Sequence, residues 1–298
     1  MTAMLTAPDA NNRPLFAAKD LAPFYVDNGP NIFSNKCGCG LLGSVGSTVR
    51  ALVGPKYDGK YLQQVIRDNL GHTRLHQTLT NIVIPTFDIR NMQPTIFSSY
   101  QSWDFNLIDG GVAANNPTLV AIREAMKQVL QNYPDFFPVQ PLNYDRLLVI
   151  SLGTGAAKQE QKYTAEMAAK WGVFSWLIQG NSSPIIDVYN QSSKDMVDYF
   201  LSVVFQALNS QDNYLRIQDE TLKGAASSID ITTKENLDEL VKIGQDLLMS
   251  PASRVNLQTG NSEPIPNGGT NQDALIKFAK ILSDEQNLRR STSQQQIE

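Results

Sequence analysis

A carboxylate followed by two glycines is the part of the sequence best suited to do chemistry. Asp109 ends an apolar run, 105–108, and is followed directly by Gly110 and Gly111. A carboxylate can accept a proton as a general base, and glycine lets the backbone come close to a reacting group. The same tripeptide is also typical of a plain turn, because Asp and Gly both tolerate left-handed backbone conformations.

The residues around Asp109 predict the elements that position it. Residues 103–108 alternate large apolar with polar side chains, which predicts a strand. Further on, Asn116 can cap a helix, Pro117 suits its first position, and apolar residues from Leu119 to Leu130 keep a helical spacing. Asp109 is therefore expected where a strand ends and a loop leads into a helix, the edge at which α/β sheets bind ligands.

Two serines are the candidates for a nucleophile within the sequence. Ser44 lies in a Gly/Ser cluster, but Leu42 stands where a Gly-x-Ser-x-Gly elbow needs glycine, and no strand precedes it. A surface loop is the favoured interpretation there. Ser151 lies within a predicted strand, 146–152, and not at the glycine turn beyond it. Neither serine matches the elbow.

Histidines and cysteines give no metal site. His72 and His76 are expected on one face of a helix, but no Glu stands between them, and zinc needs three or four ligands, so a structural pair is favoured. Cys37 and Cys39 are too close in sequence for an unstrained disulfide, which favours free thiols and points weakly to a reducing compartment. No metal or other cofactor is expected.

Composition gives no sign of nucleic-acid binding or of a membrane-spanning segment. The net charge of −4 gives no reason to expect nucleic acid, and no apolar run is long enough to span a membrane. An aromatic-rich segment, 171–178, is predicted to pack in the core; if it were exposed, it could meet acyl chains or a membrane surface.

Alternation of helices with short apolar strands predicts an α/β protein. The predicted strands are 81–88, 94–99, 105–108, 147–152 and 213–217. The predicted helices are 61–69, 119–130, most of 165–209, 234–249 and 274–282, while 19–33 is expected to be a helix or an extended segment. The tail 289–298 has no core-forming pattern.

The segment 109–117 resembles the Asp-Gly-Gly segment of the patatin family of lipid acyl hydrolases. Residues 54–62, 75–89, 93–99 and 148–155 are similar to the plant patatin-like proteins, and the resemblance extends from the first residue to about residue 245. It implies a patatin-like three-layer α/β sandwich with a mostly parallel central sheet. Residues 1–122 would be the C-terminal part of the catalytic domain, 123–288 further strands and helices packed on the same unit, and 289–298 a disordered tail.

The resemblance also implies an activity and its residues. Patatins hydrolyse fatty acyl esters of phospholipids and galactolipids with a Ser-Asp dyad and without a cofactor, so Asp109 would be the general base and Gly110 and Gly111 its supporting loop. Residues 1–8 match the segment that follows the family's serine elbow, and the oxyanion loop lies further upstream. The sequence is therefore expected to lack the nucleophile and the N-terminal strands, and to be inactive as written.

The alternative is a catalytically dead patatin-fold protein for storage or lipid binding. The expected partners are membrane lipids or a lipid substrate, with no nucleic acid. The expected location is the cytoplasm, or the vacuole if a signal lies upstream.

Overall fold

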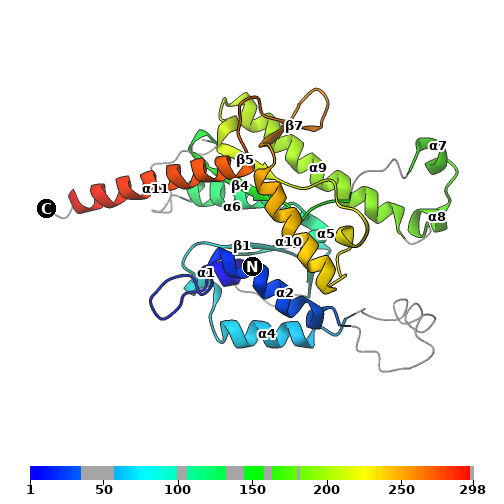
Figure 1. The fold of residues 1–298 in the computed structure, drawn as a ribbon, viewed down its shortest axis with the longest axis horizontal. Coiled ribbons are helices and arrows are strands. Elements are labelled where there is room, and N and C mark those ends of the chain that lie inside the picture. The colour runs from blue at the N-terminus through cyan, green and yellow to red at the C-terminus, as the bar shows by residue number, and fades with distance from the viewer. Residues whose placement is uncertain (35–56, 99–105, 132–143, 158–162, 180–181, 296–298) are drawn as a thin grey trace. The chain divides into compact units, whose positions relative to one another are not determined.

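A computed structural model describes residues 1–34, 57–98, 106–131, 144–157, 163–179 and 182–295 (Figure 1). The chain forms two compact units that interleave along the sequence. The first is Met1–Ile82, Phe97–Trp103 and Lys223–Ile243, and the second is Val83–Ile96, Asp104–Leu222 and Gly244–Glu298. Cys37, Cys39 and Ser44 lie outside the described residues.

The first unit is mostly helical in its described part, and it also includes the last two residues of strand β2, Phe97 and Ser98. Its elements are α1 (Thr2–Thr6), η1 (Ala18–Asp20), α2 (Leu21–Ile32), α4 (Lys60–Leu70), η2 (Leu75–Gln77), η6 (Gly224–Ser227) and the start of α10 (Lys234–Met249). Helices α2 and α4 pack together, and the Tyr61 hydroxyl donates to Asn28 Oδ1 at 3.0 Å. The Tyr57 hydroxyl donates to Asp230 Oδ2 at 2.8 Å, which ties the segment before α10 to the rest of the unit.

The second unit contains small sheets with helices around them. Strands β1 (Val83–Asp88), β2 (Gln93–Ser98) and β3 (Leu107–Asp109) form a sheet in the order β2-β1-β3, and β1 and β3 are antiparallel. Strands β4 (Val149–Leu152) and β5 (Tyr214–Ile217) pair in parallel, and β6 (Ser253–Val255) pairs with β7 (Ser262–Pro264). The helices are α5 (Gly111–Ala114), α6 (Thr118–Leu130), η4 (Tyr144–Arg146), α7 (Ala165–Ala168), α8 (Val173–Leu177), α9 (Pro184–Ala207), η5 (Gln211–Asn213) and α11 (Asn271–Gln295), with the end of α10.

Successive side chains of a strand point to opposite faces, so β4 and β5 present apolar side chains on both faces of the pair. Helices pack against each face. On one face Tyr214 joins the core residues of α6 and α9, among them Leu201 and Phe205, which are fully buried. On the other face Leu215 and Ile217 pack against Phe278 of α11, with Leu247 of α10 beside them. This helix–sheet–helix layering fits the expected α/β class, and the parallel pairing expected of the sheet is found here, whereas β1 and β3 run antiparallel.

Most predicted elements are present, with shifted ends. Helices were predicted at 61–69 and 234–249, where α4 and α10 lie, and a strand at 213–217, where β5 lies. Helix α11 is longer than predicted and runs through Gln295, into the tail predicted to be without structure. Polar side chains bury no core but can still support a helix, and Arg289 Nε donates to Glu285 Oε1 at 2.7 Å one turn earlier.

Two predictions about side-chain environments are wrong. His72 and His76 do not share a helix, because α4 ends at Leu70 and Gly71 follows with φ 53°, a left-handed value that commonly ends helices. The aromatic-rich segment 171–178 is not packed into the core throughout, since Phe174 is 84% exposed. Among the described residues, no helix has the length and apolar character needed to cross a bilayer.

Candidate functional site

Asp109 lies at the end of β3, with its carboxylate exposed. Its Cα pairs with that of Thr86 across the antiparallel β1–β3 register, and the short helix α5 follows directly. Asp109 Oδ1 accepts a hydrogen bond from the Gly111 backbone N–H at 2.7 Å. The sequence prediction of a strand end followed by a helix is therefore confirmed. The carboxylate is held at the turn by one oxygen and keeps further acceptor positions on its two oxygens.

Gly110 is the residue that fixes this turn against β1. A Cβ atom at Gly110 would stand 2.0 Å from the Pro85 carbonyl oxygen and 2.9 Å from the Thr86 nitrogen, both backbone atoms that cannot move aside. Gly111 is less constrained, since its Cβ would meet the Asp109 carboxylate oxygen at 3.2 Å. The close approach at Gly110 is to the neighbouring strand, and the role expected of both glycines, close approach of the backbone to a nucleophile, stays a prediction.

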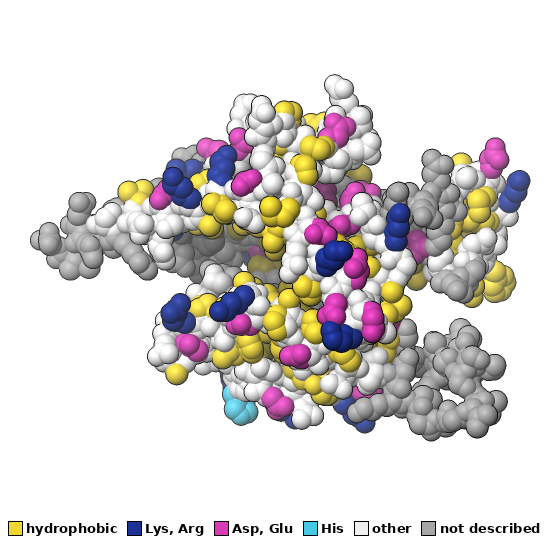
Figure 2. Space-filling view, in the orientation of Figure 1, with side chains coloured by type: hydrophobic (Ala, Val, Ile, Leu, Met, Phe, Trp, Pro, Cys, Tyr) yellow, Lys and Arg dark blue, Asp and Glu magenta, His cyan; other side chains and the backbone are white. Residues whose placement is uncertain are grey.

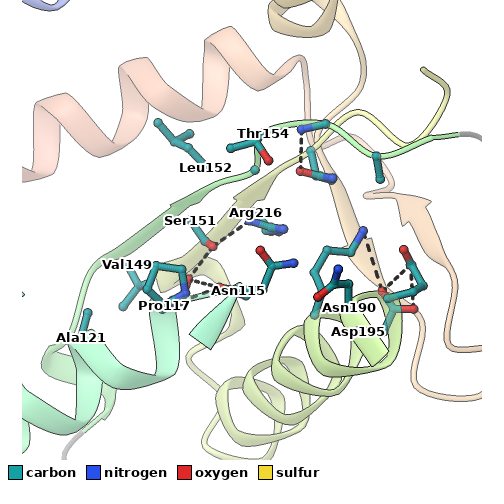
Figure 3. Close-up of a pocket in the computed structure, with 18 of the residues that line it drawn as sticks. Asn115, Pro117, Ala121, Val149, Ser151, Leu152, Thr154, Asn190, Asp195 and Arg216 are labelled. Atoms are coloured by element: carbon teal, nitrogen blue, oxygen red, sulfur yellow. Dashed lines mark hydrogen bonds and ion pairs between the residues drawn. The ribbon is translucent and has the colours of Figure 1, made fainter. Parts of the chain in front are cut away.

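A cavity of about 1380 Å³ opens in the second unit beside the end of β4 (Figure 3). Its lining comes from the start of α6, the strand β4, the turn after it and one side of α9, including Thr118, Ser151, Gly153 and Lys194. Asp109, Gly110 and Gly111 are not among its lining residues. The cavity is larger than the ~300–1,000 Å³ usual for ligand pockets, so it has room for a lipid chain or head group.

A closed ring of polar side chains lies on the α6/α9 side of β4 and β5. Asp198 of α9 accepts from Asn116 Nδ2 at 2.7 Å and from Arg216 Nε at 3.1 Å. Arg216 Nη1 donates to Ser151 Oγ at 3.1 Å, and Ser151 Oγ lies 2.6 Å from Thr118 Oγ1 (Figure 3). Thr118 closes the ring, because its hydroxyl donates to Asn116 Oδ1 at 2.7 Å. The ring joins four elements, α6, α9, β4 and β5.

Register explains how β4 and β5 supply neighbouring members of this ring. Ser151 and Arg216 are direct partners in the parallel β4–β5 pairing, so their side chains emerge on the same face. Tyr214, two residues before Arg216 and on the same face, donates its hydroxyl to Asp198 Oδ1 at 3.2 Å. Asp198 therefore accepts three hydrogen bonds, one of them from a guanidinium.

The charges in this ring are set by burial and pairing. Burial raises the pKa of the Asp198 carboxyl above its ordinary value, and this effect exceeds the opposite effect of the Arg216 guanidinium. Burial also raises the pKa of the Tyr214 hydroxyl, and the charge of Asp198 adds to the increase. Tyr214 therefore remains a donor to Asp198 across the pH range in which proteins work.

Ser151 is held in a way that does not suit a nucleophile. The side chain is buried, and the groups bonded to its Oγ are the Thr118 hydroxyl and the Arg216 guanidinium. Activating a serine requires a base that takes up its proton, and neither of these groups does so. The position of Ser151 within β4 agrees with the sequence prediction that it lies on the strand and not at an elbow.

Lys194 is a second cation of the cavity wall, besides Arg216. Its side chain is about 10% exposed, and Nζ lies 3.6 Å from Glu220 Oε1 and 3.9 Å from Asp195 Oδ1. Within the described residues Nζ makes no hydrogen bond. In the same part of the chain no cluster of three or more metal-ligating side chains occurs, and both histidines are exposed.

Sequence reasoning missed Asp198, Tyr214 and Arg216. The signal for Arg216 was present, because a lone charged residue interrupts the apolar strand Tyr214–Ile217. The signal for Asp198 was weaker. Helix α9 carries many polar residues, so the sequence alone does not show which of them face the core.

Comparison with known proteins gives the relationship directly. The chain is 47% identical over 335 aligned positions to "Patatin-like protein 1" of Arabidopsis thaliana, covering all of this chain and 80% of that protein. It is 48% identical to "Patatin-like protein 2" of Oryza sativa subsp. indica, covering 98% of this chain and 81% of the relative. It is also 39% identical to "Probable inactive patatin-3-Kuras 1" of Solanum tuberosum, covering 97% and 80%.

The alignment with the Arabidopsis protein is longer than this chain, 335 positions against 298 residues, so at least 37 positions of the relative have no counterpart here. No family model matches the chain. The identity over nearly the whole chain nevertheless exceeds what chance or a shared fold produces. The chain therefore belongs to the patatin-like proteins, a hydrolase family.

Proposed function

We propose that this protein is the base-bearing part of a lipid acyl hydrolase, which cleaves fatty acyl esters of phospholipids and galactolipids with Asp109 as the general base of a Ser-Asp dyad. The observation that supports this most is the geometry of Asp109: an exposed carboxylate at a strand end, anchored by the Gly111 N–H at 2.7 Å. A base must be accessible to the proton it abstracts and held in one orientation, and Asp109 meets both conditions.

The reaction requires three groups. A serine Oγ attacks the ester carbonyl while the carboxylate of Asp109 takes its proton, and backbone donors stabilise the oxyanion. The alcohol then leaves with a proton, and water hydrolyses the acyl-enzyme. The 298 residues contain no Gly-x-Ser-x-Gly sequence. We therefore propose that the nucleophile is not among these residues and that residues 1–298 alone do not hydrolyse esters.

The alternative is a patatin-fold protein without catalysis that binds or stores lipid. Two observations favour it: a relative 39% identical to this chain is named probably inactive, and Ser151 is enclosed by non-basic groups. The large cavity lined by β4 and α9 would then be the lipid-binding feature.

The deciding experiment uses a fluorophosphonate probe, which labels serines activated for acyl transfer. The protein isolated from its source is labelled, and the labelled serine is located by peptide mass spectrometry together with the intact mass. Purified residues 1–298 are treated in parallel. We expect no labelling of residues 1–298; labelling at Ser44 or Ser151 would refute the assignment of an outside nucleophile.

The role of Asp109 is tested in any preparation that hydrolyses a fatty acyl ester. Asp109→Asn should lower kcat by about 10²-fold or more, because general-base catalysis contributes ~10²–10⁴-fold. Asp246→Asn, an equally exposed carboxylate on α10, is the matched control and should leave kcat unchanged. An unchanged kcat in Asp109→Asn would remove Asp109 from the mechanism. A source protein that neither hydrolyses esters nor reacts with the probe would leave the lipid-binding alternative.

A further inference from the structure

The short helix α8 and the residue after it present a concentrated apolar surface. Val173 is 72% exposed, Leu177 50% and Ile178 65%, and Phe174 is the most exposed of the group. Hydrophobic side chains gather at this end of the second unit in the space-filling view (Figure 2). Side chains of this size are normally mostly buried, so four of them exposed on the six residues from Val173 to Ile178 require an explanation.

The apolar surface continues onto the start of α9, against which α8 packs. Ile185, Ile186 and Tyr189 are each about half exposed there. Across the whole segment from Trp171 to Ile186 the sequence contains no charged residue. These side chains form an uncharged surface that can enter an apolar phase without desolvating a charge, and the exposed Lys170 and Asp187 lie at the two ends of the segment.

A row of aromatic rings lies in the same part of the chain as the exposed side chains. Tyr163, Trp171 and Trp176 pack edge to face in a row, with ring centroids 5.3 Å apart for the first pair and 5.0 Å for the second. The two tryptophans are partly buried. Tyr and Trp have an apolar body and a polar group, so they favour the boundary between a bilayer and water. The segment therefore combines strongly exposed aliphatic and Phe side chains with partly buried amphipathic rings.

The four side chains of α8 expose less area than one side of a stable protein complex, and the three on α9 bring the total close to that size, so the absence of charge within the segment, and not its area, favours a lipid layer. Val173, Phe174, Leu177 and Ile178 together expose roughly 500 Å², if a large apolar side chain offers about 150–250 Å² when free. Each partner of a stable protein complex contributes ~800 Å². Insertion into a bilayer needs no such complementary area, because it gains with every apolar side chain that leaves water.

We propose that the α8 surface, comprising Val173, Phe174, Leu177 and Ile178, inserts into the interfacial region of a phospholipid bilayer. This contact would bring the second unit to the surface that holds its substrate, and in that sense it rests on the proposed lipid acyl hydrolase function. Binding itself requires no catalysis. Because the segment has no charge, the proposal includes binding to zwitterionic phosphatidylcholine without any requirement for anionic lipid.

The test is co-sedimentation of the full chain with vesicles of ether-linked phosphatidylcholine, which contain no ester to hydrolyse. We expect the wild type to partition onto the vesicles and Phe174→Asp to weaken partitioning about tenfold or more, the effect of losing one buried large apolar side chain. The matched control is Ile229→Asp, since Ile229 is 95% exposed and belongs to the first unit. It should bind as the wild type does.

A second readout locates the contact. Brominated phosphatidylcholine should quench the fluorescence of Trp171 and Trp176 in the wild type and much less in Phe174→Asp. Asp109→Asn should bind and be quenched like the wild type, so loss of catalysis and loss of membrane binding are separate results. The proposal is overturned if the wild type does not bind these vesicles, or if Phe174→Asp binds equally well. A dimer that Phe174→Asp dissociates, without vesicle binding, would assign the surface to a second copy of the chain instead.

Discussion

Removing the Asp198 carboxylate should be among the most destabilising single changes in the second unit. Asp198 accepts from Asn116 at 2.7 Å, Tyr214 at 3.2 Å and Arg216 at 3.1 Å, and the Arg216 side chain is only 14% exposed. Asp198→Ala would leave a buried guanidinium without its counter-charge and two donors without an acceptor. Breaking a buried ion pair by removing one partner costs about 3–5 kcal/mol.

We therefore expect Asp198→Ala to lower the free energy of unfolding by about 4 kcal/mol, a large part of the ~5–15 kcal/mol typical of a folded protein. The measurement is urea unfolding followed by circular dichroism, with the midpoint and the slope both fitted. The matched control is Glu285→Ala, which removes an exposed partner of Arg289 and should cost at most about 0.5 kcal/mol.

A double variant separates the pair from the rest of the ring. Asp198→Ala combined with Arg216→Met removes both charges, so no buried cation is left unpaired, and part of the lost stability should return. A loss below about 1 kcal/mol in Asp198→Ala would refute the reasoning, because it would mean that solvent reaches Arg216 freely once the carboxylate is gone. An equal loss in the single and double variants would show that the two charges are not coupled.

Further predictions concern packing, backbone contact and pH. Gly110→Ala should lower the free energy of unfolding by about 2 kcal/mol or more, because its Cβ would overlap the Pro85 backbone. Gly244→Ala in α10, with open space around it, should raise the free energy of unfolding by about 0.5–1 kcal/mol. Urea unfolding of both variants measures these opposite changes. Phe205→Ala should cost about 3–5 kcal/mol in the same assay, since this ring is fully buried. The raised pKa of Asp198 means that the native state binds its proton more tightly than the unfolded chain does, so this group's contribution to stability falls as pH rises above the ordinary value of 3.8. The free energy of unfolding of the wild type, relative to that of Asp198→Asn, should therefore decrease as the pH rises above 3.8. An increase would contradict the predicted direction.

Local pattern was enough to predict where the elements lie. The helical spacing of 234–249 and the strand at 213–217 were identified because each carries a clear periodicity, and the turn chemistry of Asp109 and Gly110 gave the strand–loop–helix order. The His72–His76 prediction failed at a single residue, because Gly71 adopts a left-handed conformation that spacing alone does not reveal.

The polar ring shows what pattern cannot supply. Asn116 was predicted as a helix cap, and its Oδ1 does accept from the Thr118 N–H at 3.2 Å, but its amide is turned to Asp198, 82 residues later. Contacts at this separation depend on how α9 crosses β4 and β5, which no local periodicity encodes. Arg216 and Asp198 could have been noticed as charges within apolar segments, but their pairing could not have been predicted from either residue alone.

Exposed strand residues connect the fold to the comparison with relatives. Ile108 of β3, at one edge of its sheet, is 38% exposed, and Leu152 of β4 is 69% exposed. Apolar side chains on strands are usually covered by a neighbouring strand or helix, because burial is what stabilises a sheet of few strands. The Arabidopsis relative carries at least 37 aligned positions that this chain lacks. Within the described residues, Ile108, Leu152 and the Asp109 that ends β3 are exposed, so β3 and β4 carry side chains that no described element covers.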